Sequence, residues 1–259
     1  MPSRAPAILA LDFDGVLCDG MREYFESAWR ACRRLRPDAP LAPPSGLFEG
    51  FARLRPLVET GWEMTAVVHA LRAGAAPAAL EKDWRPDAWL ADLGATREAA
   101  TAALDRVRDE WIAADEHGWL ESHRFYPGVI ERLRGLADGS VAVYVVTTKE
   151  GRFARQLLRR QGIELPEGHV YGKEARRPKR VILVELAGDR DAGRVWFVED
   201  RLTTLQDAKT EPTLARAGLF LAAWGYNTPE DREAARRDDR IVLLALERFG
   251  QDFAAWGHA

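Results

Sequence analysis

The sequence predicts an α/β fold in which helices flank a parallel β-sheet, and into which a helical domain is inserted. Strand-like apolar runs alternate with helical patterns after residue 140, an order typical of a parallel sheet. One further strand-like run lies near the N-terminus, at Ala7–Leu11. Between these regions the helical period continues for about a hundred residues, which is too long for a simple crossover between strands. An inserted helical domain is therefore expected.

The composition is that of a soluble protein with a full hydrophobic core. The 259 residues are 47% hydrophobic and 30% charged, with a net charge of −3. This balance provides no basic field for nucleic acid or for an anionic membrane, so small-molecule partners are expected. Cys18 and Cys32 are too few for a disulfide framework, and no apolar run approaches the roughly 18 residues of a membrane span. We expect a cytoplasmic protein, either a monomer or a homodimer.

The first strand ends in two acids separated by one residue. Ala7–Leu11 runs directly into Asp12-Phe13-Asp14-Gly15-Val16. Both carboxylates are thereby delivered to one edge of the sheet, where ligands of open α/β folds bind. One acid can attack a substrate while the other moves protons. Asp and Gly also form ordinary turns after strands, so the pair alone leaves both interpretations open.

Helical patterns dominate the next hundred residues or so. An apolar stripe from Met21 to Cys32 predicts a helix that ends before Pro37, and a turn-rich segment follows. Further helical patterns cover residues 54–71 and the region after Thr96. Six of the nine tryptophans lie between residues 20 and 120, which is best explained as core packing. Only three residues remain as candidates for substrate contact in this region: Glu59, Trp62 and Glu63.

The sheet resumes at the β-branched run Val141–Val146, which ends in Thr147-Thr148-Lys149. A helix, a short strand at His169–Tyr171 and a basic loop containing Lys179 follow, and this loop opens another helix. A further strand, Val195–Val198, ends in Glu199-Asp200. The pattern then predicts a last strand and two helical segments: Leu219–Ala223, Glu230–Arg237 and Leu243–Phe253.

Chemically useful side chains thus recur at strand ends and at one helix start. In order and spacing, Asp12 with Asp14, then Thr147, Lys179 and the pair Glu199-Asp200 resemble the four motifs of the haloacid dehalogenase-like superfamily. The turn Tyr126-Pro127-Gly128-Val129 is similar to that family's return from a cap domain to the core. The resemblance implies a Rossmann-like core and a helical cap of the first cap subclass, as in phosphoglycolate phosphatase and beta-phosphoglucomutase relatives. The expected divisions are residues 1–19 (core), 20–121 (cap) and 122–259 (core).

The resemblance also implies a role for each motif. Asp12 is the expected nucleophile and Asp14 the general acid and base. Thr147, with Thr148 as its variable neighbour, and Lys179 are the expected phosphate-binding residues. The implied cofactor is Mg²⁺, with expected ligands Asp12, the backbone carbonyl of Asp14, Asp200 and, as an outer ligand, Glu199. Glu199 departs from the family's Gly-Asp form, and Thr204 stands where a second acid often occurs.

Each of these motifs has a plainer explanation. Thr147 can simply end a strand, because threonine favours sheets. Lys179 lies in a basic run, Arg176–Arg180, that is also typical of a solvent-exposed loop or of a nucleic-acid-binding patch. The segment Trp224–Asn227 could border a pocket, but a turn is the safer interpretation, and we leave it out of the predicted site.

Asp14 discriminates best among the reactions of this superfamily. Its phosphatases and phosphomutases keep an acid at this position, whereas its dehalogenases lack one. The predicted function is therefore that of a phosphoric monoester hydrolase, a magnesium-dependent phosphatase that hydrolyses a small phosphate monoester through an aspartyl-phosphate intermediate. The alternatives are a phosphomutase of the same superfamily and a non-catalytic member that binds a phospho-ligand.

Overall fold

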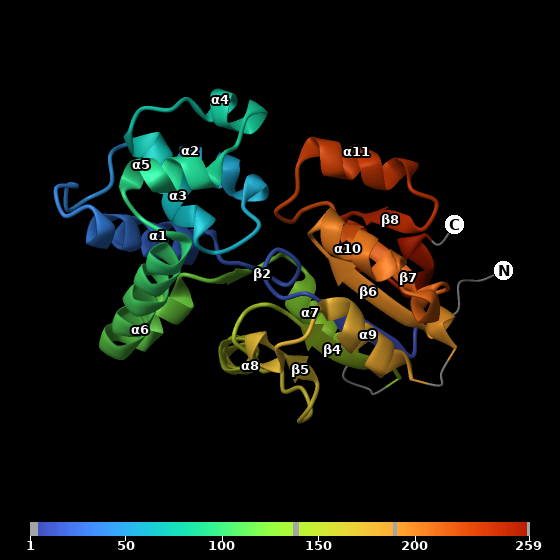
Figure 1. The fold of residues 1–259 in the computed structure, drawn as a ribbon. Helices are drawn as coiled ribbons and strands as arrows, with labels where there is room; N and C mark the ends of the chain where they lie inside the picture. Colours follow the sequence, from blue (N-terminus) through green and yellow to red (C-terminus); the bar gives the residue numbers. More distant parts are fainter. Residues whose placement is uncertain (1–4, 137–139, 189–190, 258–259) are drawn as a thin grey trace. The chain divides into compact units, whose positions relative to one another are not determined.

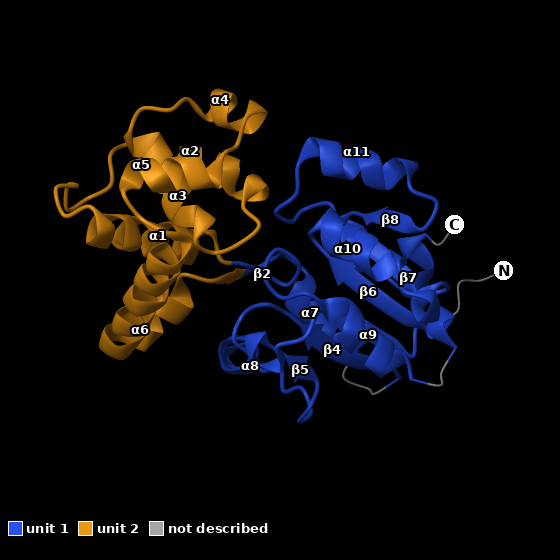
Figure 2. Cartoon of the chain, viewed as in Figure 1, with its two compact units in different colours: residues 1–19, 125–259 blue, residues 20–124 orange. Residues whose placement is uncertain are grey.

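The computed structural model describes residues 5–136, 140–188 and 191–257. The chain divides into two compact units (Figures 1 and 2), of which the first comprises Met1–Asp19 and Phe125–Ala259. The second unit, Gly20–Arg124, is inserted between the two parts of the first. Two short strands, β2 (Cys18–Asp19) and β3 (Arg124–Phe125), pair with each other where the chain passes from one unit to the other.

The first unit is built on a six-stranded sheet with the order β5-β4-β1-β6-β7-β8. Every neighbouring pair is parallel, which confirms the predicted fold class. The chain builds the sheet outward from β1, first towards β5 and then, on the other side, towards β8. The carboxyl end of β1 is thus a topological switch point, and ligands of open α/β sheets bind at such points. The strands are β1 (Ile8–Leu11), β4 (Ala142–Val146), β5 (Val170–Tyr171), β6 (Val195–Glu199), β7 (Gly218–Ala222) and β8 (Ile241–Leu244).

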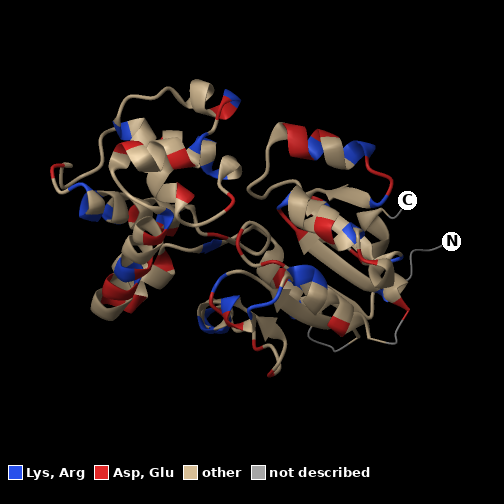
Figure 3. Cartoon of the chain, viewed as in Figure 1, with Lys and Arg blue, Asp and Glu red and all other residues tan. Residues whose placement is uncertain are grey.

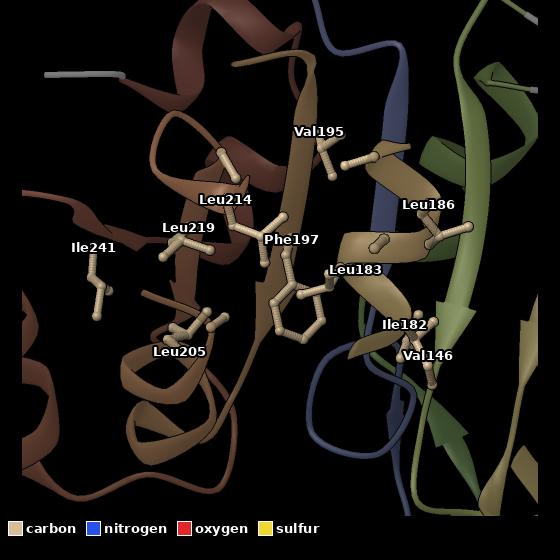
Figure 4. Close-up of a cluster of buried hydrophobic side chains, with 14 of the residues drawn as sticks. Val146, Ile182, Leu183, Leu186, Val195, Phe197, Leu205, Leu214, Leu219 and Ile241 are labelled. Carbon is tan, nitrogen blue, oxygen red and sulfur yellow. The ribbon is translucent and has the colours of Figure 1, made fainter. Parts of the chain in front are cut away.

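Strand β6 shows why these residues form a buried sheet. Its sequence, Val-Trp-Phe-Val-Glu, is apolar on both faces, as expected for a strand covered on both sides. Phe197 packs in a cluster with Leu183 and Leu205 (Figure 4). Trp196, the next residue back, belongs to the opposite face, because successive side chains of a strand alternate. Its ring contacts those of Phe220 and Trp256.

Helices connect and cover the strands of this unit. The helix α11 shows how the local sequence sets a start, because Thr228 and Asp231 form a reciprocal capping box and Pro229 follows the cap. The α-helices of this unit are α7 (Val129–Gly135), α8 (Gly151–Arg160), α9 (Lys179–Ala187), α10 (Leu202–Lys209), α11 (Pro229–Arg237) and α12 (Leu246–Phe249). The described part of this unit also contains the 3₁₀ turns η2 (Lys173–Ala175), η3 (Ala192–Arg194), η4 (Pro212–Leu214) and η5 (Phe253–Trp256).

The prediction was wrong at the C-terminal end of the sheet. The expected helix at Leu243–Phe253 begins instead as strand β8, which pairs in parallel with β7. Only α12 and η5 are helical there, so Leu219–Ala223 does not contain the last strand. An apolar run of four residues is too short to distinguish the period of a helix from that of a strand. Residues 241–244 form a strand because they pair with the edge of β7.

The second unit is helical, with α1 (Met21–Leu35), α2 (Leu47–Leu54), η1 (Arg55–Leu57), α3 (Glu63–Arg72), α4 (Pro77–Lys82), α5 (Pro86–Leu93) and α6 (Arg97–Glu121). The helical stretch expected over residues 54–71 is divided, since Pro56 and Gly61 fall within it. The helix α6 begins after Thr96, whose side chain accepts a hydrogen bond from the Ala99 N–H.

Charged residues are distributed differently in helices and strands. Both signs are mixed along α6 and α11 (Figure 3). In the six strands of the sheet, by contrast, Glu199 at the end of β6 is the sole charged residue. Among the described helices, none combines the length and the apolar character needed to cross a bilayer. Glu199 is fully buried, so the carboxyl end of β6 is the place in the sheet where a charged side chain needs a specific partner.

Candidate active site

The register of the sheet brings three strand ends together. Leu11, the last residue of β1, lies opposite Val145 of β4 and Val198 of β6. The residue after it, Asp12, is therefore level with Glu199, and its N–H donates to the Val198 carbonyl at 2.9 Å. Thr147 follows β4 at the same edge of the sheet, and it is buried like Asp12 and Glu199. This adjacency depends on the strand order, because β1 lies between β4 and β6.

A tight turn after β1 shapes the first loop. The Phe13 N–H donates to Asp12 Oδ1 at 2.7 Å, which fixes the orientation of that carboxylate. Gly15 has a φ of +86°, a conformation that residues with a side chain rarely adopt. A Cβ at this position would also lie 2.0 Å from Asp200 Oδ2. Glycine is thus required both by the turn and by the close approach of Asp200.

Lys179 joins two of the acids. It is the first residue of α9, and its Nζ lies 2.9 Å from Asp12 Oδ1 and 2.6 Å from Glu199 Oε2. Burial alone would lower the pKa of Lys179, but the charges of Asp12 and Glu199 raise it above its ordinary value. The lysine is therefore a permanent cation between the two carboxylates. The Lys179 side chain is only 11% exposed, so it is not the solvent-exposed lysine of the plainer interpretation.

The three acids Asp12, Glu199 and Asp200 form a compact oxygen cluster. One carboxylate oxygen from each lies within 4.8 Å of those of the other two. Burial, and then the charge of Glu199, raise the pKa of Asp12 to about 7. Burial also raises the pKa of Glu199 to about 7, with a contribution from Asp200. Lys179 supplies one positive charge against three carboxylates, so the cluster has a net negative charge when all three acids are ionised.

This donor set fits a hard divalent cation. Three carboxylates and one ammonium sum to two negative charges, which one Mg²⁺ would neutralise. Oxygen ligands are those that Mg²⁺ prefers, and magnesium sites commonly use one or two protein carboxylates together with phosphate oxygens and water.

Asp14 is placed apart from this cluster and has a different cation. The Lys149 Nζ lies 3.2 Å from Asp14 Oδ1 and 3.4 Å from Oδ2. The backbone N–H of Lys149 donates to Thr147 Oγ1 at 3.1 Å, so Lys149 contacts Thr147 through its backbone and Asp14 through its ammonium. Thr148, by contrast, is exposed. The two aspartates of the first motif are thus paired with lysines from two different segments of the chain.

The sequence analysis assigned no role to Lys149, and it wrongly left Tyr226 and Asn227 out of the predicted site. The Tyr226 N–H donates to Asp200 Oδ2 at 2.8 Å, and the Asn227 side chain donates to the Asp200 carbonyl at 3.0 Å. Their position in the sequence could have identified them. Lys149 follows β4, and Tyr226 and Asn227 follow β7, so all three lie at the edge of the sheet that carries the acids.

In the inserted unit, two of the three candidate side chains are engaged in local packing. The carboxylate of Glu63 accepts hydrogen bonds from the Thr60 N–H at 2.9 Å and from Trp84 Nε1 at 3.2 Å. The Trp62 ring lies under the Arg97 guanidinium, at 5.0 Å from its centre. Glu59 is exposed. These contacts give Glu63 and Trp62 a structural role within this unit.

Known proteins share both the sequence pattern and the fold. A family model for haloacid dehalogenase-like hydrolases matches residues 6–210. A haloacid dehalogenase-like family hydrolase from Streptococcus pneumoniae has a TM-score of 0.60 and 15% identity, covering 93% of this chain and 94% of its own. A predicted phosphoglycolate phosphatase from Haemophilus somnus 129pt also has a TM-score of 0.60, with 17% identity over 91% and 92% of the two chains.

A further solved structure is a family hydrolase from Deinococcus radiodurans R1 with bound phosphate and sodium. Its TM-score is 0.53 and its identity 16%, over 93% of this chain and 92% of its own. No curated protein matches the sequence. At these identities the solved structures show a common fold, while the family model covers most of the chain.

Proposed function

Because the chain belongs to the family of haloacid dehalogenase-like hydrolases, we propose that it is a magnesium-dependent phosphatase that hydrolyses a small phosphate monoester through an aspartyl-phosphate. The observation that carries this proposal is the buried carboxylate of Asp12, 2.9 Å from the Lys179 ammonium and grouped with two further acids. Asp14, two residues on, supplies a second acid at the same loop. The phosphatase named among the similar structures agrees with this chemistry.

In the first step, a carboxylate oxygen of Asp12 forms a bond to phosphorus, and the bond from phosphorus to the ester oxygen breaks. The leaving oxygen takes its proton from Asp14. The product alcohol departs, and the phosphoryl group remains on Asp12. Two lower barriers thereby replace one high barrier.

In the second step, water attacks the same phosphorus. Asp14, now a carboxylate, accepts a proton from that water, and the bond between phosphorus and the Asp12 oxygen breaks. Inorganic phosphate leaves, Asp12 is regenerated as a carboxylate and Asp14 is again protonated. Atoms and charge therefore return to their starting arrangement after each turnover.

The attack of an anion on a dianionic phosphate is repulsive, so the site needs cations. Lys179 supplies one positive charge, and we propose that the Thr147 hydroxyl donates a hydrogen bond to a phosphate oxygen. Asp12, Asp200 and the Asp14 carbonyl would hold Mg²⁺, with Glu199 as an outer ligand. When bound, Mg²⁺ would neutralise phosphate charge as a Lewis acid.

The test is hydrolysis of p-nitrophenyl phosphate, with and without Mg²⁺, by the wild-type protein and by Asp12→Asn. We expect release of nitrophenolate that requires Mg²⁺ and that Asp12→Asn lowers to background. The matched control is Asp38→Asn, since Asp38 is an exposed aspartate of the inserted unit. Equal rates for Asp12→Asn and the wild type would refute the proposal.

A further inference from the structure

The segment Trp224–Asn227, which follows β7, holds Asp200 at two points. The Tyr226 N–H donates to Asp200 Oδ2 at 2.8 Å. The Asn227 Nδ2 donates to the Asp200 carbonyl at 3.0 Å and to the Ala222 carbonyl at 2.8 Å. Tyr226 and Asn227 are only 5% and 3% exposed. Both the carboxylate and the backbone of Asp200, which follows β6, are thus held by residues of the segment after β7.

Two glycines allow this close packing. A Cβ at Gly225 would lie 2.3 Å from the Asp200 Cβ and 2.6 Å from the Gly15 carbonyl oxygen. A Cβ at Gly15 would likewise meet Asp200 Oδ2. The loop after β1, Asp200 and the segment after β7 therefore lie in direct contact. Asp200 has little room to take another position.

The segment is itself anchored to the first loop and to the residues beside the insertion. The Tyr226 hydroxyl donates to Asp19 Oδ1 at 2.7 Å, and the side chains of Tyr226 and Tyr126 are hydrogen-bonded to each other. The Trp224 Nε1 donates to the Val16 carbonyl at 3.0 Å. The position of the Tyr226 N–H, and with it the orientation of Asp200, thus depends on contacts with three other parts of the first unit.

We propose that Tyr226 and Asn227 are positioning residues that orient Asp200 for binding Mg²⁺; this inference rests on the proposed function. A carboxylate that already accepts a directed hydrogen bond on one oxygen cannot rotate freely, so its other lone pairs keep a fixed direction. Outer hydrogen-bond partners of metal ligands typically change metal affinity by about 10–100-fold when they are removed.

The experiment is calorimetric titration of the full chain with MgCl₂ alone. We expect Asn227→Ala to lower the affinity for Mg²⁺ by about tenfold, because the donor to the Asp200 carbonyl is lost. A higher Mg²⁺ concentration should then be needed for half-maximal hydrolysis of p-nitrophenyl phosphate. The control is Tyr144→Phe, since Tyr144 stacks on His169 in the same unit. This control should bind Mg²⁺ as the wild type does.

A second variant covers the case in which Asn227→Ala does not fold. Tyr226→Phe removes the hydroxyl that binds Asp19 but keeps the N–H that binds Asp200, and we expect it to lower the affinity for Mg²⁺ by less than Asn227→Ala does. Wild-type affinity in every variant that folds, or no Mg²⁺ binding by the wild type, overturns the inference. Binding of Mg²⁺ that weakens in the variants, without hydrolysis of any phosphate ester by the wild type, would refute the proposed function alone.

Discussion

Replacing Lys179 with methionine tests whether one ammonium stabilises the acid cluster. The Nζ lies 2.9 Å from an Asp12 oxygen and 2.6 Å from a Glu199 oxygen, and the side chain is 11% exposed. At an effective dielectric constant of about 20, Coulomb's law gives a gross attraction of roughly 6 kcal/mol for each pair. Methionine is also unbranched and similar in length but carries no charge. Both carboxylates would therefore lose their counter-ion.

The net effect is smaller than the gross attraction, since burying the three charges has its own cost. Removing one partner of a buried ion pair typically costs about 3–5 kcal/mol, and we expect a loss of that size in the free energy of unfolding near pH 8. The raised pKa values of Asp12 and Glu199, each about 7, rise further without the lysine. Near pH 5.5 both acids are then neutral in the folded variant, so the loss should be smaller.

The sign of this pH dependence follows from linkage. A folded-state pKa above the unfolded value means that the folded protein binds protons more tightly. The protonated forms of Asp12 and Glu199 therefore add to the free energy of unfolding. This contribution is present in full below about pH 4 and is lost as the pH rises through about 7. In Lys179→Met this pH-dependent loss of stability should continue to higher pH, because without the ammonium the pKa values of the two folded-state acids are higher still.

The assay is urea unfolding followed by tryptophan fluorescence, at both pH values. Lys173→Met is the matched control, because Lys173 is an exposed lysine of η2, in the segment between β5 and α9. The control should change stability by no more than about 0.5 kcal/mol. An additional Glu199→Gln in the Lys179→Met protein should recover part of the loss. Equal losses for the two lysine variants, or a loss at pH 5.5 as large as at pH 8, would refute the reasoning.

Three further predictions concern catalysis, metal binding and packing. Asp14→Asn should slow hydrolysis of alkyl phosphates by about 10²–10⁴-fold but that of p-nitrophenyl phosphate less, since nitrophenolate leaves without a proton; equal slowing contradicts the acid role. Mg²⁺ should raise the melting temperature more near pH 8 than near pH 5.5, because protons compete for Asp12 and Glu199; equal shifts at both values would argue against metal binding there. Trp256→Ala should cost about 3–5 kcal/mol in urea unfolding, because the ring is fully buried against Trp196; a loss below about 1 kcal/mol would show that the site collapses around the gap.

The site could be predicted where its residues lie at the ends of regular elements. Asp12, Glu199 and Asp200 come at the ends of apolar runs that predict buried strands, and Lys179 opens a helix. Parallel strands place their carboxyl ends at one edge, so these residues were expected together, and the structure brings them together. The pairing of Asp14 with Lys149 was not predicted, because a side-chain contact between two loops leaves no periodic signal.

The sequence by itself determined the α/β class, the family and the strand ends that carry the acids, because burial imposes a short period that can be read locally. Only the tertiary structure decided that β8 is a strand, that each aspartate of the first loop has its own lysine, and that Tyr226 and Asn227 bind Asp200. These features depend on the order of strands in the sheet. That order joins residues as far apart as Asp14 and Lys149, whose contact is set by the packing of the whole unit and by no local pattern.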